Sequence, residues 1–218
     1  MPSIEELRIA DEPAAWRAAG FEVDGELCVV SRVRLRLVGR GELRGIVDWT
    51  LGRAEAGAGA GAGAAASGGA GAGAAGAHPN GALRVDHVVM LSPDLDRTVG
   101  ELESQGFELR RRREGPTPGG STRQAFFRAG EPILELVQAP EGTSVARDPE
   151  GPARLWGLAL LTGDLDRTAA FLGDLLGSPR DAVQEGRRIA TLRPEAGLGP
   201  AIAFMSPGPG AIPAQGST

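Results

Sequence analysis

The chain has 218 residues, a net charge of −5 and an isoelectric point near 5.2. This acidic balance argues against a nucleic-acid or anionic-membrane partner, because both carry negative charge. The start, MPSIEELRIADEP, lacks the cationic and apolar regions of a signal peptide. No apolar run reaches the roughly 18–20 residues that cross a bilayer. We therefore expect a cytoplasmic protein without a membrane partner.

Residues 1–53 are expected to form a small unit of strands with one helix at 12–19. Its expected strands are short and lie at 4–9, 21–24, 27–30, 33–38 and 45–51. The run SRVRLRLVG resembles the later run GEPILELVQ, with Arg36 in the place of Glu135. This likeness predicts that residues 3–39 are a degenerate copy of the unit found further along the chain. An unrelated β-rich extension is the alternative.

Residues 56–77 are almost pure glycine and alanine, with one serine. Because such side chains cannot form a core, residues 54–80 are predicted to be a flexible linker. The G-x-G-x-x-G spacing that begins at Gly71 follows no strand and precedes no helix start, which excludes a dinucleotide site. The tail, 209–218, is rich in proline and glycine and is also expected to be loose.

The stretch Leu83–Gly106, LRVDHVVMLSPDLDRTVGELESQG, predicts a strand followed by a helix. Ser92 is the expected helix cap and Pro93 the expected first helical residue. Three further short strands are expected at 107–114, 123–129 and 132–139. Together these elements form a β-α-β-β-β unit.

The unit occurs twice, because the pentapeptide DLDRT at Asp94–Thr98 returns at Asp164–Thr168. One such unit cannot bury its own apolar face, so the repeat predicts that two units pair. The predicted fold class is α+β, with paired β-α-β-β-β units at 81–140 and 152–208 within a region 81–208. They are expected to form a curved mixed sheet with helices on its outer side.

This duplicated pattern resembles the vicinal oxygen chelate superfamily, which includes glyoxalases, bleomycin-resistance-type binders and extradiol dioxygenases. The resemblance covers residues 83–206, through VDHVVMLSPDLDRT, RQAFFRAGEPILELVQ and RRIATLRPEAGLGPAIAFM. It implies a glyoxalase-like cup in which the first and last strands of each unit hold a divalent metal (Zn, Fe, Mn or Ni). It does not imply one activity, because a single fold hosts many chemistries.

In the first unit, His87 and Glu135 match the metal-ligand positions that the resemblance implies. Strand alternation places His87 on one face with Val85, and imidazole plus carboxylate is a normal start to a metal site. In the second unit the matching positions, 70 and 68 residues later, hold Gly157 and Ala203, which cannot ligate. Two protein ligands fall short of the three or four that zinc requires, so we expect no tightly held metal.

His87 and Glu135 also allow other interpretations. They can form a hydrogen-bonded structural pair, or they can act as the catalytic acid and base of an enzyme. Few other residues could serve in catalysis, because the chain has no tyrosine, one cysteine and two histidines. Cys28, in the apolar run LCVV, is expected to be buried. His78 is expected to be exposed in a polar turn. The arginines at 110–113 are expected to form a solvated strand edge, with an anion clamp as the alternative.

The expected inner face of the second unit is lined by small residues, which leave room for a ligand. Gln124, Gly157 and Ala203 are the candidate ligand-binding residues, whereas Trp156 is expected to pack on the helix side. One functional class is a metal-free protein that binds a small organic molecule. The other is a glyoxalase-like lyase or isomerase, or a dioxygenase-like enzyme, that uses His87 and Glu135. The sequence leaves both classes open, and it leaves open whether the chain forms a homodimer.

Overall fold

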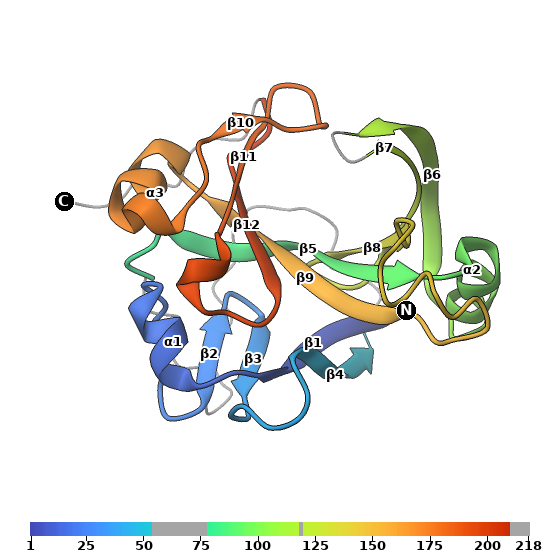
Figure 1. The fold of residues 1–218 in the computed structure, drawn as a ribbon, viewed down its shortest axis with the longest axis horizontal. Coiled ribbons are helices and arrows are strands. Elements are labelled where there is room, and N and C mark those ends of the chain that lie inside the picture. The colour runs from blue at the N-terminus through green and yellow to red at the C-terminus, as the bar shows by residue number, and fades with distance from the viewer. Residues whose placement is uncertain (54–77, 118–119, 210–218) are drawn as a thin grey trace, which may run out of the picture.

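The computed structural model describes residues 1–53, 78–117 and 120–209, which form two sheets with a shared hydrophobic core (Figure 1). Most of the expected linker and nearly all of the expected tail lie outside these residues. None of the helices in the described part of the chain is long and apolar enough to cross a membrane.

The larger sheet has eight strands in the order β10-β11-β12-β9-β5-β8-β7-β6 and contains both copies of the repeated unit. The first copy consists of β5 (Ala82–Ser92), α2 (Leu95–Ser104), β6 (Glu108–Thr117), β7 (Gly120–Arg128) and β8 (Ile133–Gln138). The second consists of β9 (Arg154–Thr162), α3 (Leu165–Leu172), β10 (Arg180–Asp181), β11 (Arg188–Thr191) and β12 (Ala201–Met205), with short 3-10 turns at Gly173–Leu175 and Pro194–Ala196.

The two copies join through their first strands. β5 and β9 pair antiparallel, and each pairs in parallel with the last strand of its own copy, β8 or β12. The predicted α+β fold, with paired β-α-β-β-β units in one mixed sheet, is therefore confirmed.

The smaller sheet has four strands in the order β2-β3-β1-β4. Its elements are β1 (Pro2–Ala10), α1 (Pro13–Ala18), β2 (Leu27–Val30), β3 (Val33–Leu37) and β4 (Gly45–Arg53). The strand expected at 21–24 is absent: only Asp24 forms a single bridge, to Leu27, across a tight turn. Gly25 in this turn has a φ of 56°, a left-handed conformation that glycine adopts without strain.

The smaller sheet lies against the outer face of the larger one, so that the two share one core (Figure 1). Phe21 stacks on Phe204 with ring centroids 6.3 Å apart, and Trp49 stacks on Phe107 at 5.9 Å. Helices α2 and α3 pack on the same core through apolar residues that include Leu95, Val99, Leu102, Leu165 and Leu172. The opposite face of the larger sheet is left for a site.

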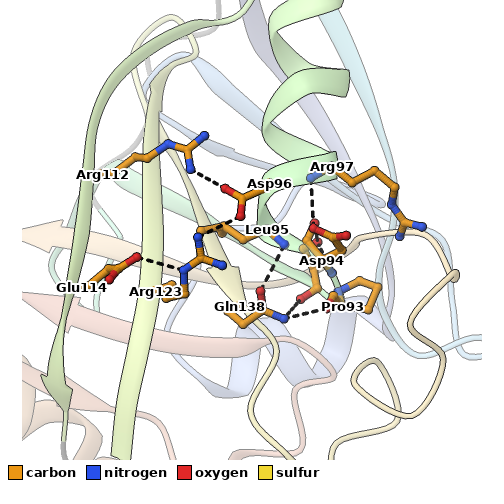
Figure 2. Close-up of polar contacts among 10 residues, drawn as sticks. Pro93, Asp94, Leu95, Asp96, Arg97, Arg112, Glu114, Arg123 and Gln138 are labelled. Carbon is orange, nitrogen blue, oxygen red and sulfur yellow. Dashed lines mark hydrogen bonds and ion pairs between the residues drawn. The ribbon is translucent and has the colours of Figure 1, made fainter.

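The two DLDRT segments begin α2 and α3 in the same way. The Asp94 carboxylate accepts a hydrogen bond from the Arg97 backbone N–H at 3.0 Å, and the Asp164 carboxylate accepts one from the Arg167 N–H at 3.0 Å. Each aspartate is therefore the helix N-cap. Figure 2 shows the region around the first of these caps.

The expectation that Ser92 caps the helix was wrong. Its hydroxyl lies 2.7 Å from the Thr98 hydroxyl, and Pro93 precedes the helix instead of beginning it. In the second copy the Thr162 hydroxyl lies 2.8 Å from that of Thr168. The residue at the end of each first strand thus ties the strand to its helix.

Candidate functional site

The face of the larger sheet that points away from the smaller one carries two rows of side chains that cross the strands. The first row runs through Arg111, Phe126, Glu135, Val89, Gly157 and Ala201. The second runs through Ile133, His87, Ala159, Ala203 and Thr191. Both ends of the sheet contribute to one cavity of about 530 Å³, lined by Arg111, Arg113, Val183, Gln184 and Glu185. Of these lining residues only Arg111 belongs to the two rows. We call the face that carries the rows the cup and the rows its floor.

The register shows which residues of the two copies correspond. His87 lies across from Ile133 in the first copy, and Gly157 lies across from Ala201 in the second. The first copy thus contributes the polar residues of the floor, and the second copy contributes small glycine and alanine residues.

His87 and Glu135 contact each other directly. The distance from His87 Nε2 to Glu135 Oε2 is 3.1 Å, and the two side chains are 14% and 13% exposed. They are covered by neighbours but still reachable from the cup, as a binding or catalytic pair must be.

Asp86 lies on the other side of the His87 ring, with its Oδ2 3.1 Å from His87 Nδ1. Adjacent residues of a strand normally face opposite sides, but β5 has a bulge here. Val85 pairs with Leu160 and His87 with Ala159, which leaves Asp86 unpaired. The bulge also puts Val85 in the fully buried core, so the expectation that Val85 shares a face with His87 was wrong.

Arg187, from the second copy, holds Asp86 in place. Its two terminal nitrogens donate to the two Asp86 oxygens at 3.1 Å each, and its Nε donates to the Ser206 carbonyl at 2.9 Å. Burial by itself would raise the pKa of Asp86, but the hydrogen bonds from His87 and Arg187 outweigh it and hold that pKa well below its ordinary value. Asp86 is therefore ionised and accepts from His87 Nδ1–H.

With Nδ1–H donated to Asp86, Nε2 is the His87 nitrogen that remains to face Glu135. The 3.1 Å contact between His87 Nε2 and Glu135 Oε2 is an ion pair when the imidazole is protonated.

Gln124 completes the polar group. Its Nε2 donates to Glu135 Oε1, while its Oε1 is buried and has no hydrogen-bond partner among the described residues. A buried acceptor without a partner is unusual in proteins. Sequence reasoning named Gln124, His87 and Glu135 as candidates, and the structure brings these three together; it did not name Asp86 or Arg187. The one available signal was a charged residue directly before His87 in an apolar strand.

The residues of the cup do not fit the metal that the resemblance implied. Both His87 nitrogens contact carboxylates, and the Glu135 oxygens contact His87 and Gln124. A side chain at Gly157 would place its Cβ 2.5 Å from the Ala201 carbonyl oxygen, so the backbone itself excludes a ligand there. Within residues 1–53, 78–117 and 120–209, no three His, Cys, Asp or Glu side chains are grouped to hold a metal ion.

Two other expectations were wrong. Trp156 is 52% exposed instead of packing on the helix side, because a second bulge leaves it unpaired between Leu155 and Gly157. His78 is only 6% exposed, because it is buried between the smaller sheet and the start of β5. Cys28, by contrast, is buried as expected, and burial raises the pKa of its thiol to about 12.

Strand order and register thus define an α+β fold of two paired β-α-β-β-β units, with a polar pair on its open face. No protein-family model and no curated protein matches the chain. Among solved structures, it is similar to methylmalonyl-CoA epimerase from Mycobacterium tuberculosis, at 22% identity and a TM-score of 0.49, over 59% of this chain and 91% of that one.

A complex of the Streptomyces coelicolor methylmalonyl-CoA epimerase is similar at 24% identity and a TM-score of 0.48, over 61% of this chain and 98% of that one. A hypothetical protein from Bacillus halodurans is similar at 18% identity and a TM-score of 0.49, over 59% and 97%. At TM-scores below 0.5, these likenesses assign neither a family nor an activity to the chain.

Proposed function

We propose that this chain binds a small organic molecule in the cup, without a complete metal site. The observation that carries the proposal is the floor itself, where the partly exposed His87–Glu135 pair lies in the same rows as the small residues Gly157, Ala159 and Ala203. Small-molecule sites combine apolar space with a few well-placed polar groups. The two halves of this floor supply these two components.

The polar half favours a ligand with a hydrogen-bond donor. Gln124 Oε1 offers a buried acceptor, and Glu135 lies beside it. The apolar part of the ligand would lie over Ala201 and Ala203, which are partly exposed. Burying a polar network costs free energy unless each of its polar atoms has a hydrogen-bond partner. A donor on the ligand would give Gln124 Oε1 the partner that it lacks.

A second candidate is a lyase or isomerase in which His87 and Glu135 transfer a proton. The observation that favours it is Asp86, which orients the His87 ring so that Nε2 points at Glu135. A general acid or base held by a third group is a common catalytic arrangement. A proton carried by His87 or Glu135 would be the one exchanged with a substrate in the cup.

Filling the cup tests the proposal. Ala203 is partly exposed on the floor, so Ala203→Trp should fold but block the cup. We expect this change to abolish binding of phenylnaphthylamine, an uncharged fluorescent probe. Gln105→Trp is the matched control, because Gln105 lies beside a different cleft on the outer side. Probe binding that survives Ala203→Trp, or a lack of binding to the native chain, would contradict the proposal.

Glu135→Gln separates a site from a structural pair. The Gln124 amide can turn to offer Oε1 to the new amide, so we expect a melting temperature close to that of the native chain. Ligand co-purified with the full chain, measured by native mass spectrometry, should fall at least about 10-fold. A variant that is destabilised by about 3–5 kcal/mol and keeps its ligand would show a purely structural pair. Stoichiometric metal in the native chain, found by elemental analysis, would favour the metal enzyme instead.

A further inference from the structure

The four arginines of β6 divide into two kinds. Arg110 donates to Glu108 at 2.6 Å, and Arg112 pairs with Asp96 at the start of α2 (Figure 2). These two have carboxylate partners and serve the structure. Arg111 and Arg113 line the cavity of about 530 Å³ instead. Arg110, Arg111 and Arg112 are exposed and Arg113 is partly buried, which fits the expected solvated edge.

Arg111 is held in place without a carboxylate. It begins the first floor row, and its guanidinium carbon lies 4.6 Å from the centroid of the Phe126 ring. Among the described residues no group accepts a hydrogen bond from Arg111 or forms an ion pair with it. Stacking uses the face of a guanidinium and leaves the N–H groups at its edge free to bind an oxyanion in a fork.

The position of Arg111 connects it to the polar pair. Phe126, which supports Arg111, lies directly across from Glu135 in the sheet. On the opposite wall, Gln184 accepts a hydrogen bond from Arg187 at 2.6 Å, and Arg187 is the residue that holds Asp86. We call the cavity lined by Arg111, Arg113, Val183, Gln184 and Glu185 the mouth of the cup. The contacts above link residues of the mouth to residues of the floor.

The charges at the mouth favour an anion. Arg111 and Arg113 contribute two positive charges to the cavity lining, against one negative charge from Glu185. Glu185 forms no ion pair with a described residue, so the two walls do not neutralise each other through a direct contact. A cation would meet two like charges there, whereas an oxyanion would meet the fork of Arg111.

We infer that the ligand of the cup carries an oxyanion, a carboxylate or a phosphate-type group, which Arg111 binds at the mouth. This inference rests on the proposed function, because it names the class of molecule that the cup takes. The apolar body of the ligand then lies over the small residues of the second copy.

Paired fluorescent probes test the inference on the full chain. Anilinonaphthalene sulfonate has an anionic group, and phenylnaphthylamine has the same apolar body without it. Arg111→Met should weaken binding of the sulfonate about 10-fold or more, as loss of a charge-assisted hydrogen bond does, and leave the neutral probe nearly unchanged. Arg110→Met is the matched control on the same strand and should change neither. Glu185→Gln removes a like charge and should strengthen binding of the sulfonate alone.

Competition distinguishes the two anion classes. Benzoate and phenyl phosphate should both displace the sulfonate probe, whereas benzyl alcohol should not, and the stronger competitor identifies the preferred oxyanion. If Arg111→Met and Glu185→Gln leave sulfonate binding unchanged while the neutral probe still binds, the inference is wrong and the proposed function stands. If neither probe binds the native chain, the proposed function fails. Should Arg111→Met not fold, the response to Glu185→Gln decides alone.

Discussion

At the scale of single residues, the two histidines have opposite environments. His87 faces the cup between two carboxylates, whereas His78 is buried among backbone groups. His78 Nδ1 accepts a hydrogen bond from the Glu22 N–H at 3.0 Å, and the ring lies 3.1 Å from the Val29 carbonyl through Nε2. The ring is therefore neutral with its proton on Nε2, and burial lowers the pKa of His78 below its ordinary value.

Stability should therefore fall as the pH is lowered. Protonation of His78 would remove the acceptor of the Glu22 N–H, so the folded chain takes up this proton less readily than the unfolded chain. Between the lowered pKa and the ordinary value of 6.5, the unfolded state binds more protons, and stability rises with pH. We expect the free energy of unfolding in urea to drop from about pH 7.5 to about pH 5.5. In His78→Asn the drop should be smaller, and an equal drop in both chains would contradict this assignment.

At the scale of elements, the repeated pentapeptide gave the most reliable prediction. Asp94 and Asp164 cap α2 and α3 through the same backbone contact, so Asp94→Ala and Asp164→Ala should each cost about 1 kcal/mol of unfolding free energy. The control is Asp96→Ala, because Asp96 is exposed and pairs only with arginine side chains. A cost as large for Asp96→Ala would show that the ion pairs, not the caps, stabilise the helix starts.

The repeated DLDRT segment allowed the pairing of the two copies to be predicted, and the family resemblance together with strand alternation predicted that His87 and Glu135 are neighbours. The sequence could not show the bulges at Asp86 and Trp156, because an apolar strand has no polar alternation that an extra residue would visibly interrupt. These bulges bring Asp86 to the His87 ring and expose Trp156. Arg187 could not be identified either, because its contact with Asp86 spans 101 positions of the chain.

The smaller sheet repeats the geometry of the polar pair with different chemistry. Glu6 lies across from Arg34 and bonds to Arg36, at 2.9 and 3.0 Å, just as His87 lies across from Ile133 and contacts Glu135. In both sheets, a residue of the first strand thus contacts the side chain two positions beyond its partner on the parallel last strand. This correspondence supports the prediction that residues 3–39 are a degenerate copy of the unit, with an ion pair where the cup has its site.

At the scale of the whole molecule, the smaller sheet is part of the core and not an independent appendage. Asp11 is fully buried, and its carboxylate accepts from the Trp16 ring N–H at 3.0 Å and from the Gly199 backbone N–H at 2.8 Å. One side chain therefore joins the first helix to the loop before β12. Nearby, Arg40 bonds to the Gly197 carbonyl of the same loop.

A chain that starts at Asn80 should therefore fail to fold as a soluble protein. Removing residues 1–79 would uncover the outer face of the larger sheet, including Phe107, Leu158 and Phe204, which are almost fully buried in the complete chain. Exposed apolar surface of this extent promotes aggregation, and the Gly199 N–H would lose its partner. We expect most of the shortened chain in the insoluble fraction, and recovery when residues 1–79 are produced alongside it as a separate chain. A soluble shortened chain with a cooperative melting transition would mean that the paired units complete their own core.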